Sequence, residues 1–360
     1  MLKIVNFFKN INNSNMLYGI INFRLKDVFN MYILAKSVLA LMIGFVAAII
    51  IGLIIVPLFR RKKNEQVTSV FVKQHKEKSG TPTMGGLIFT ISTIVAILLL
   101  LFLKKMNISA NLIIVLFTFF GYGLIGFIDD YLKIKYHSNE KGLSRIQKLI
   151  GQIILAIIFF YIYIKDGSTP NIEISALNID VNLGFVYGFF ILFMMVGTSN
   201  AVNLTDGLDG LSGGLSAICF LVYGLIAWNS SWLSGYDDIA VFCFILVGGL
   251  LGFLVFNSHP AKIFMGDTGS LALGGTLAAV AILTRRELLL AIVGGVFVIE
   301  TLTVILQILS VKIRGKKLFP MTPIHHTFEK LGWSESDIVR LFYVVGFILG
   351  AGAIVYTVWL

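Results

Sequence analysis

The sequence has 360 residues, of which 57% are hydrophobic and only 13% are charged. A water-soluble domain of this length needs far more charge on its surface, so the composition excludes one and indicates a polytopic membrane protein. The net charge of +10 does not indicate nucleic-acid binding, because the cytoplasmic loops of membrane proteins are themselves rich in Lys and Arg.

The first 31 residues differ from the rest of the chain. They mix apolar side chains with Lys3, Lys9, Arg24 and Lys26 and contain no uninterrupted apolar core. This pattern is not that of a signal peptide. It predicts a segment that lies on the membrane surface at 1–31, followed by one transmembrane domain over 32–360.

Ten apolar stretches are long enough to cross a bilayer, which takes about 17–25 helical residues. They predict an all-α polytopic fold with about ten transmembrane helices. The expected spans are 32–58, 83–103, 108–128, 146–164, 184–204, 211–228, 239–256, 271–284, 288–310 and 338–358.

The distribution of basic residues predicts the orientation. The loops at 59–82, 129–148, 257–270 and 311–337 carry eighteen Lys and Arg, and the loops on the opposite side carry five. The richer side is expected to be cytoplasmic, which puts both termini in the periplasm.

On the outer side, residues 171–182 alternate apolar and polar side chains around a small-residue centre. That pattern predicts a short β-hairpin.

Four groups of polar residues follow apolar spans, all on the predicted cytoplasmic side. They are Asp129–Asp130, Asn203 to Gly210, Asn257 to Asp267, and His325–His326. An acid at mid-helix costs roughly 2.5–3.5 kcal/mol on insertion scales. Four separate segments that accept such a cost on one face predict a shared polar site that handles a metal and phosphate.

The pair Asp129–Asp130 ends the third span. A single acid there is commonly a polar stop at the interface, but two adjacent acids on a side that favours cations indicate function. Adjacent carboxylates leave a helix end in different directions, so one could bind a metal while the other accepts a proton.

The stretch from Asn203 to Gly210 follows the fifth span. Residues three apart share a helix face, so Asn203, Asp206 and Asp209 are expected to form one stripe towards the aqueous side. A calcium loop is disfavoured, because the spacing does not match the twelve-residue pattern.

The third group combines several ligand-binding chemistries. Magnesium favours a few carboxylates plus phosphate oxygens, which suits Asp267. Lys262 and backbone amides could hold phosphate, and Phe264 could stack on a base. Lys78, among hydroxyls and glycines before the second span, also suits phosphate.

The last group is His325–His326. Adjacent histidines rarely share a tetrahedral zinc site, and no cysteine is near them in sequence, so hydrogen bonding or proton transfer to phosphate is the better interpretation. Glu300 and Gln307 lie inside the ninth span and are functional candidates because polar groups are costly there.

Several of these strings resemble one known family. Gly80-Thr-Pro-Thr-Met-Gly-Gly86, Asp129–Asp130, Asn203 to Gly210, Phe264 to Ser270 and Pro323-Ile-His-His are similar to phospho-N-acetylmuramoyl-pentapeptide transferases. That family is a branch of the polyprenyl-phosphate N-acetylhexosamine-1-phosphate transferases. The similarity runs in matching order from about residue 32 to the end.

The resemblance implies a reaction and a setting. Undecaprenyl phosphate would attack the sugar-linked phosphate of UDP-N-acetylmuramoyl-pentapeptide, giving lipid I and UMP, with Mg²⁺ as cofactor. This is the first membrane step of peptidoglycan synthesis. It also implies a bacterial cytoplasmic membrane, an active site facing the cytoplasm, and a homodimer.

The resemblance also implies residue roles. Asp267 would bind magnesium, and Asp129, with Asp130 beside it, would activate the lipid phosphate. His325 and His326 would contact phosphate or the ribose side. The expected substrate-binding residues are Lys78, Thr83, Asn203, Asp206, Asp209, Asn257, Lys262, Phe264 and Gln307. Where the family pattern has a third histidine, this chain has Thr327.

Two rival functions stay open at this point. A sister enzyme loads N-acetylglucosamine-1-phosphate onto the same lipid. In a transporter, the acids would line an ion pathway, which predicts acids spread through the membrane depth rather than gathered at one face. The sequence also leaves open whether an aspartate attacks covalently or the lipid attacks directly.

Overall fold

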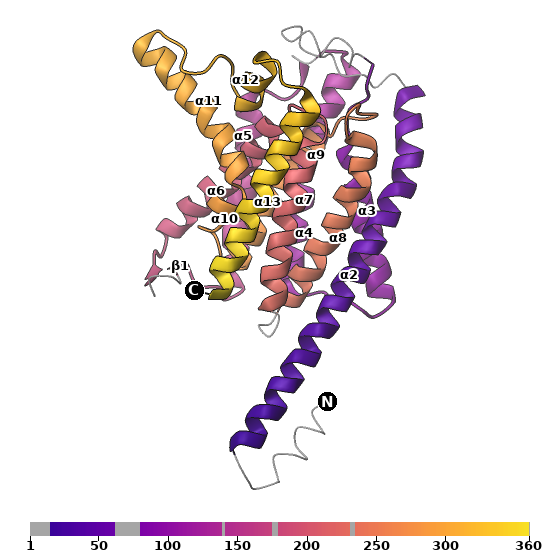
Figure 1. Cartoon of the computed structure of the whole chain (residues 1–360), viewed down its shortest axis with the longest axis vertical. Coiled ribbons are helices and arrows are strands. Elements are labelled where there is room, and N and C mark those ends of the chain that lie inside the picture. Colours follow the sequence, from indigo (N-terminus) through magenta and orange to yellow (C-terminus); the bar gives the residue numbers. More distant parts are fainter. Residues whose placement is uncertain (1–14, 62–79, 139–140, 175–178, 231–234, 360) are drawn as a thin grey trace.

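The computed structural model describes residues 15–61, 80–138, 141–174, 179–230 and 235–359. Over these residues the chain is almost entirely helical, with one small sheet (Figure 1). The helices are α2 (Asn15–Arg61), α3 (Gly86–Phe102), α4 (Ala110–Lys135), α5 (Arg145–Lys165), α6 (Val186–Thr205), α7 (Leu211–Asn229), α8 (Tyr236–Asn257), α9 (Gly266–Leu283), α10 (Leu290–Val293), α11 (Gly295–Arg314), α12 (Ile324–Lys330) and α13 (Glu335–Trp359).

The prediction of an all-α polytopic membrane protein is confirmed. Within the described ranges, nine helices are long and apolar enough to cross a membrane, and α3 adds a shorter apolar helix of 17 residues. The predicted span 288–310 is not one helix. It is divided into α10 and α11 at Gly294–Gly295, where two successive glycines weaken the helix.

The predicted β-hairpin at 171–182 is also confirmed. Strands β1 (Asn171–Ile174) and β2 (Ile179–Asn182) pair antiparallel, with Asn171 opposite Asn182. An isolated two-stranded hairpin has little stability of its own. Here Glu173 on β1 forms an ion pair with Arg286, in the loop between α9 and α10, at 3.4 Å.

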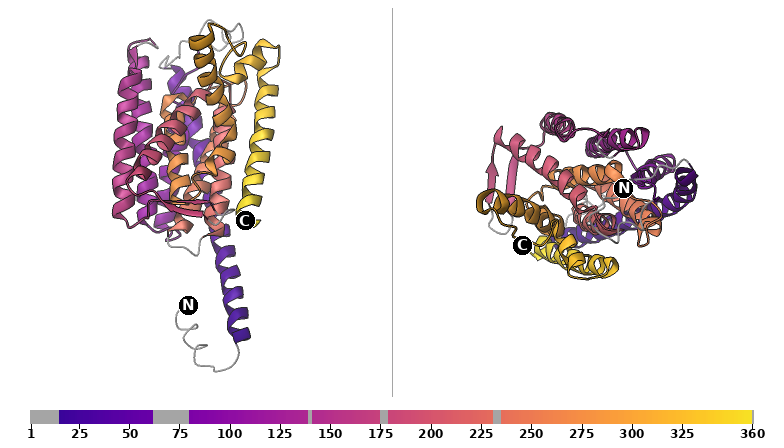
Figure 2. Two further views of the ribbon diagram at one scale, coloured as in Figure 1. Left: turned by 90° about the vertical axis from the view of Figure 1, so that its left-hand side faces the viewer. Right: turned by 90° about the horizontal axis from the view of Figure 1, so that it is seen from above.

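Helix α2 starts earlier than the predicted span. It begins at Asn15 and runs without a break through position 31 to Arg61, so that its first part protrudes from the helix bundle (Figures 1 and 2). The start of α2 and the C-terminus lie towards the same end of the molecule (Figure 1). The surface location predicted for residues 1–31 stays a prediction, because residues 1–14 lie outside the described part.

Helix α9 lies at the centre of the bundle. Of its apolar stretch 89% is buried, against 22% for α5 and for α11. Neighbouring helices approach it through glycines. A Cβ on Gly275 would lie 2.6 Å from the ring of Tyr122 on α4, and one on Gly274 would lie 2.5 Å from the backbone of Ser199 on α6. Helix α9, which carries Asp267 in its first turn, is therefore packed closely against α4 and α6.

A buried acid lies near the other end of α9. The Tyr187 hydroxyl donates a hydrogen bond to the carboxylate of Glu287, and the Tyr223 hydroxyl donates to the carbonyl of Arg286 at 3.0 Å. Burial raises the pKa of Glu287 above its usual value, because a low-dielectric environment disfavours the charged form.

This pKa shift predicts how a Glu287→Gln variant behaves. An acid with a raised pKa in the folded state stabilises the fold at low pH, and this contribution is lost as pH rises through the folded-state pKa. We therefore expect Glu287→Gln to raise the midpoint of thermal unfolding at pH 8, with a gain that shrinks towards pH 5. Thermal unfolding of the purified protein at both pH values measures this, and a gain that is larger at pH 5 would contradict it.

Candidate active site

The end of α4 meets the start of α9 at three aspartates. Asp129, Asp130 and Asp267 offer carboxylate oxygens that all lie within 4.8 Å of one another. The two helices approach so closely that a Cβ on Gly126 would overlap the backbone of Asp267. The predicted convergence of Asp129–Asp130 with Asp267 is therefore what the structure shows.

Asp130 is bound to the N-terminus of α9. Its carboxylate accepts hydrogen bonds from the backbone N–H groups of Asp267 (3.2 Å) and Thr268 (2.9 Å) and from the Thr268 hydroxyl (2.7 Å). Residue Met265, which caps α9, offers no side-chain hydrogen bond. Asp130 thus supplies from α4 the acceptor that the first N–H groups of a helix need.

Asp129 points in another direction, as expected for adjacent side chains at a helix end. One of its oxygens accepts the backbone N–H of Leu143 at 2.7 Å, and the other lies 2.5 Å from Lys133 and 3.4 Å from Lys148. Asp267 lies 2.8 Å from the same Lys148 ammonium. The two lysines therefore bridge the two carboxylates and offset their mutual repulsion.

Sequence reasoning missed Lys133 and Lys148. A signal for Lys133 existed, because it follows Asp129 by four residues and so shares its helix face. For Lys148, in the first turn of α5, the only signal was a basic residue at the start of an apolar span.

The second predicted segment, Asn203 to Gly210, contacts the aspartates at one end. The Asn203 amide donates to Asp267 at 3.0 Å and to Ser270 at 2.8 Å. The single helical stripe through Asn203, Asp206 and Asp209 was wrong, however. Helix α6 ends at Thr205 with Asp206 as its C-cap, and the chain turns away at Gly207 and Gly210.

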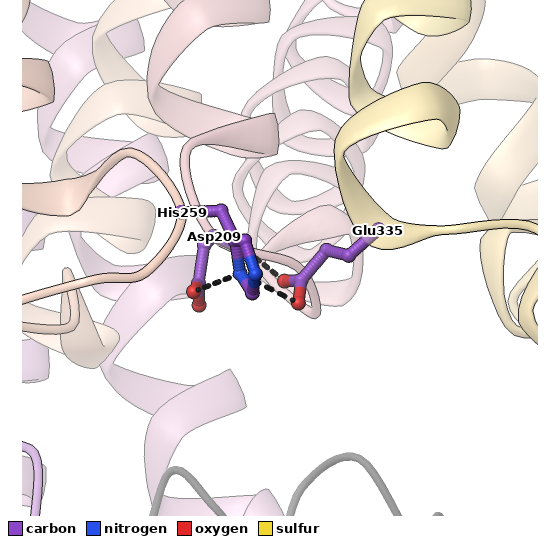
Figure 3. Close-up of side chains that lie close together, drawn as sticks. All are labelled: Asp209, His259 and Glu335. Carbon is purple, nitrogen blue, oxygen red and sulfur yellow. Dashed lines mark hydrogen bonds and ion pairs between the residues drawn. The ribbon is translucent and has the colours of Figure 1, made fainter.

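Past that turn, Asp209 belongs to a separate cluster with His259 and Glu335 (Figure 3). The His259 Nδ1 atom lies 3.0 Å from Asp209 and 3.2 Å from Glu335, and the Asp209 carboxylate also accepts the N–H of Ala261 at 3.0 Å. Glu335 in turn accepts the backbone N–H of Asp209 at 2.6 Å. These contacts tie together the loop after α6, the loop after α8 and the start of α13.

Asn257 reinforces the same connection. Its side-chain oxygen accepts the N–H of Gly210 at 3.0 Å, and its amide donates to the carbonyl of Ile263 at 2.8 Å. The loop that it holds carries Lys262, which is exposed, and Phe264, which is half-buried. Asn257 is itself 3% exposed, so in this structure it braces the loop on which those two residues lie.

Thr83, in the segment before α3, lies beside the aspartates. Backbone hydrogen bonds join Pro82 to Phe264 (2.8 Å) and Gly86 to Met265 (2.9 Å). They place Thr83 near Gly266, at which a Cβ would lie 2.8 Å from the Thr83 hydroxyl. Lys78 lies outside the described residues.

The histidines lie against the turn at Gly207. His325 is fully buried with its Nδ1 atom 3.1 Å from Glu300, and His326 is bonded to Glu329 at 2.5 Å. A Cβ on Gly207 would overlap Nε2 of His325. Gln307 is less central: its amide bonds to the backbone of Leu318 and Phe319 in the loop before α12.

The donor set at the aspartates fits a hard divalent cation. Such ions are held by carboxylate oxygens that come from few side chains. The hydroxyl of Thr83, buried beside Asp130 and Gly266, has no hydrogen-bond partner among the described residues, as expected where a ligand completes the site. The Asp209–His259–Glu335 cluster is a second group that could hold a metal ion.

Comparison with known proteins gives the family. A model of the Glycosyl transferase family 4 matches residues 112–285, and the Phospho-N-acetylmuramoyl-pentapeptide-transferase signature 1 matches residues 78–89. The Phospho-N-acetylmuramoyl-pentapeptide-transferase of Geobacillus sp. (strain WCH70) is 48% identical, covering 90% of this chain and 98% of that protein. The chain belongs to the phospho-N-acetylmuramoyl-pentapeptide-transferase family. The protein of the same name from Bacillus subtilis (strain 168) is 47% identical over 89% of this chain and 97% of its own length.

Membership of this transferase family agrees with the position of the site. The family 4 match spans α4 to α9, and therefore includes the three aspartates, Asn203 to Gly210 and the loop that carries Phe264. The signature at 78–89 includes Thr83. The histidines on α12 lie outside both matches, and only the full-length relatives connect them with the family.

The position of Lys148 between two carboxylates leads to a prediction about metal affinity. Removing its positive charge in Lys148→Met leaves Asp129 and Asp267 less neutralised. Because an ammonium a few ångströms away opposes a cation, we expect Mn²⁺ to bind roughly tenfold more tightly to this variant.

Electron paramagnetic resonance of free Mn²⁺ measures that affinity directly. Lys135→Met is the matched control, because Lys135 lies over the Tyr136 ring at the same end of α4. In the described part of the chain, the ion pairs of Asp129 and Asp267 are with Lys133 and Lys148 and do not include Lys135. Unchanged or weaker Mn²⁺ binding in Lys148→Met would contradict the arrangement.

Proposed function

We propose that this protein transfers phospho-N-acetylmuramoyl-pentapeptide from its UDP-linked form to undecaprenyl phosphate, giving lipid I and UMP. The observation that carries the proposal is the convergence of Asp129, Asp130 and Asp267 with two lysines at one end of the membrane bundle. The names of its relatives, at 47–48% identity over nearly their whole length, support the choice of substrate.

The reaction exchanges one pyrophosphate for another, so its barrier lies in bringing anionic phosphates together. An oxygen of the lipid phosphate forms a bond to the sugar-linked phosphorus. The bond from that phosphorus to the bridging oxygen breaks, and UMP leaves with the electron pair. Lys133 and Lys148 offset the negative charge that gathers there.

We propose magnesium as the cofactor, held by Asp267 with Asp129 nearby. When bound, the ion supplies positive charge that polarises the phosphoryl oxygens. Asp129 activates the lipid phosphate as a base. Asp130 holds the first turn of α9, and so fixes the direction of Asp267.

The nucleotide part of the substrate would lie over the loops joined to Asn203–Gly210. We propose that Asn203, Asp206 and Phe264 contact the uridine diphosphate, with Lys78, Thr83 and Lys262 near its phosphates. Asp209 and Asn257 contribute by holding these loops, Gln307 by holding the loop before α12, and His325 and His326 meet phosphate or the ribose side.

The proposed setting is the bacterial cytoplasmic membrane, with the aspartate cluster facing the cytoplasm. The described part of the chain has nine helices that are long and apolar enough to cross a membrane, which makes this a multi-pass membrane protein. The excess of Lys and Arg at the end that carries the site supports the orientation. UDP-linked precursors are water-soluble, so a site that opens to the cytoplasm suits their use. We further propose that the protein acts as a homodimer, as its family resemblance implies.

The experiment is a transfer assay with the purified protein. Undecaprenyl phosphate and Mg²⁺ are supplied with either UDP-N-acetylmuramoyl-pentapeptide or UDP-N-acetylglucosamine, each labelled in the sugar. We expect labelled lipid and UMP from the muramoyl substrate alone. Lipid product from UDP-N-acetylglucosamine alone would assign the sister activity, and ion flux in liposomes without UMP release would assign a transporter.

Single-residue variants in the same assay test whether turnover depends on the aspartates. Asp267→Asn and Asp129→Asn are each expected to lower turnover by about a hundredfold or more, since each removes a charge from the reacting centre. Cys219→Ala and Cys243→Ala serve as controls, because both thiols are buried among apolar helices away from the site. Near wild-type turnover in either aspartate variant would overturn the assignment of that residue.

A further inference from the structure

A buried acid and a buried histidine form a pair between α11 and α12. Glu300 and His325 each have 0% exposed side chains, and Oε2 of Glu300 lies 3.1 Å from Nδ1 of His325. Neither side chain lies at the surface. Burying two ionisable side chains in a membrane protein costs free energy. Such a pair is therefore a candidate for a functional role.

Each member of the pair keeps one unused polar atom. Oε1 of Glu300 and Nε2 of His325 are buried and have no hydrogen-bond partner among the described residues. The Nε2 edge of the ring faces Gly207, at which a Cβ would overlap that nitrogen. The other ring, His326, lies edge-on to His325 with centroids 4.2 Å apart. The unused nitrogen is therefore directed at the Asn203–Gly210 turn.

Charge balance decides whether this nitrogen donates or accepts. A lone carboxylate in such a place is far costlier than a neutral pair. In a neutral pair, either Glu300 is ionised and the ring is an imidazolium, or Glu300 keeps its proton. A proton on Oε2 is donated to Nδ1 and leaves the ring hydrogen on Nε2, whereas a proton on Oε1 would be a second buried donor without a partner and would leave Nε2 as an acceptor. In the first two arrangements Nε2 carries a hydrogen, and it is then a donor that lacks an acceptor.

We infer that Glu300 is a positioning residue that keeps His325 protonated at Nε2, so that this N–H donates to an anionic oxygen of the substrate's diphosphate. The diphosphate as acceptor rests on the proposed function. The protonation of Nε2 rests on the buried pair alone. An N–H of an imidazolium bonds more strongly to a phosphate oxygen than a neutral N–H does. The Glu300 carboxylate provides the opposite charge that stabilises a buried imidazolium between α11 and α12.

A Glu300→Gln variant tests this division of roles. The amide can still bond to Nδ1, but it cannot balance an imidazolium. We expect the affinity for UDP to fall about tenfold, as for loss of a hydrogen bond to a charged group, while the affinity for uridine, which has no phosphate, is unchanged. Equilibrium dialysis with labelled UDP and uridine measures both.

Glu287→Gln is the matched control. It makes the same change at a buried glutamate that also accepts a hydrogen bond, but near the outer hairpin rather than beside the histidines. It should leave both affinities as they are in the wild-type protein. Equal weakening of UDP and uridine binding in Glu300→Gln would show a merely structural role and overturn the inference.

Nitrogen-15 NMR of histidine-labelled protein gives a test that does not depend on activity. The His325 signal is assigned by its loss in His325→Gln. We expect a protonated Nε2 in the wild-type protein with UDP bound, and a neutral ring in Glu300→Gln. An unprotonated Nε2 in the wild-type protein would overturn the inference. If the wild-type protein forms no lipid I, the proposed function fails, yet the NMR result still decides the state of the pair.

Discussion

The close approach of α4 to α9 is the constraint on which the whole site depends. Gly126 leaves no side chain between the helices, so the backbone of Asp267 lies directly against α4. Asp130 then bonds to the first N–H groups of α9, which fixes the rotation and depth of that helix. Any larger residue at position 126 would separate Asp129 from Asp267 and dissolve the cluster.

This arrangement gives the two adjacent aspartates different tasks. The Asp130 carboxylate accepts hydrogen bonds from the N-terminus of α9, whereas the Asp129 carboxylate forms ion pairs with Lys133 and Lys148. The lysines, at 2.5 Å and 2.8 Å from Asp129 and Asp267 respectively, neutralise a concentration of acid that would otherwise be unstable near a membrane. The same charges suit the proposed reaction, in which two phosphates must meet, so the stability of the cluster and its proposed chemistry have a common electrostatic basis.

The short segment from Asn203 to Gly210 joins the other parts to that cluster. Asn203 bonds to Asp267, Gly207 lies under His325, and Asp209 bonds to the loop after α8. Glycine is needed at position 207 because the imidazole occupies the space of a side chain. At Gly210 the backbone has a φ of +81°, which L-residues with a side chain rarely adopt. The four groups of polar residues therefore form one connected structure.

The transmembrane spans, the hairpin and the grouping of the polar residues could be predicted from the sequence. Apolar length located the spans, and alternation located the hairpin, because both are local properties. The shared face of the four polar groups followed from counting spans. The break at Gly294–Gly295 was missed because the hydrophobic pattern continues through it. The helical stripe through Asp206 and Asp209 was wrong because spacing alone does not show where a helix ends.

Contacts between distant segments were not predictable in this way. Nothing near Glu335 in the sequence indicates that it meets Asp209, and the role of Asp130 as the cap of α9 appears only once the two helices are packed together. Lys133 was within reach of sequence reasoning, because a lysine four residues after an aspartate lies on the same helix face. His259 lies within the polar group from Asn257 to Asp267, but only its contacts assign it to the Asp209 cluster.

The most direct test of this account is to locate a divalent ion in the protein. Diffraction from crystals grown with Mn²⁺ and UDP, recorded at a wavelength where manganese scatters anomalously, gives its position. The account predicts a peak beside Asp267 and Asp129, next to the diphosphate. A peak only at the Asp209–His259–Glu335 cluster, or at no carboxylate of α4 and α9, would contradict it.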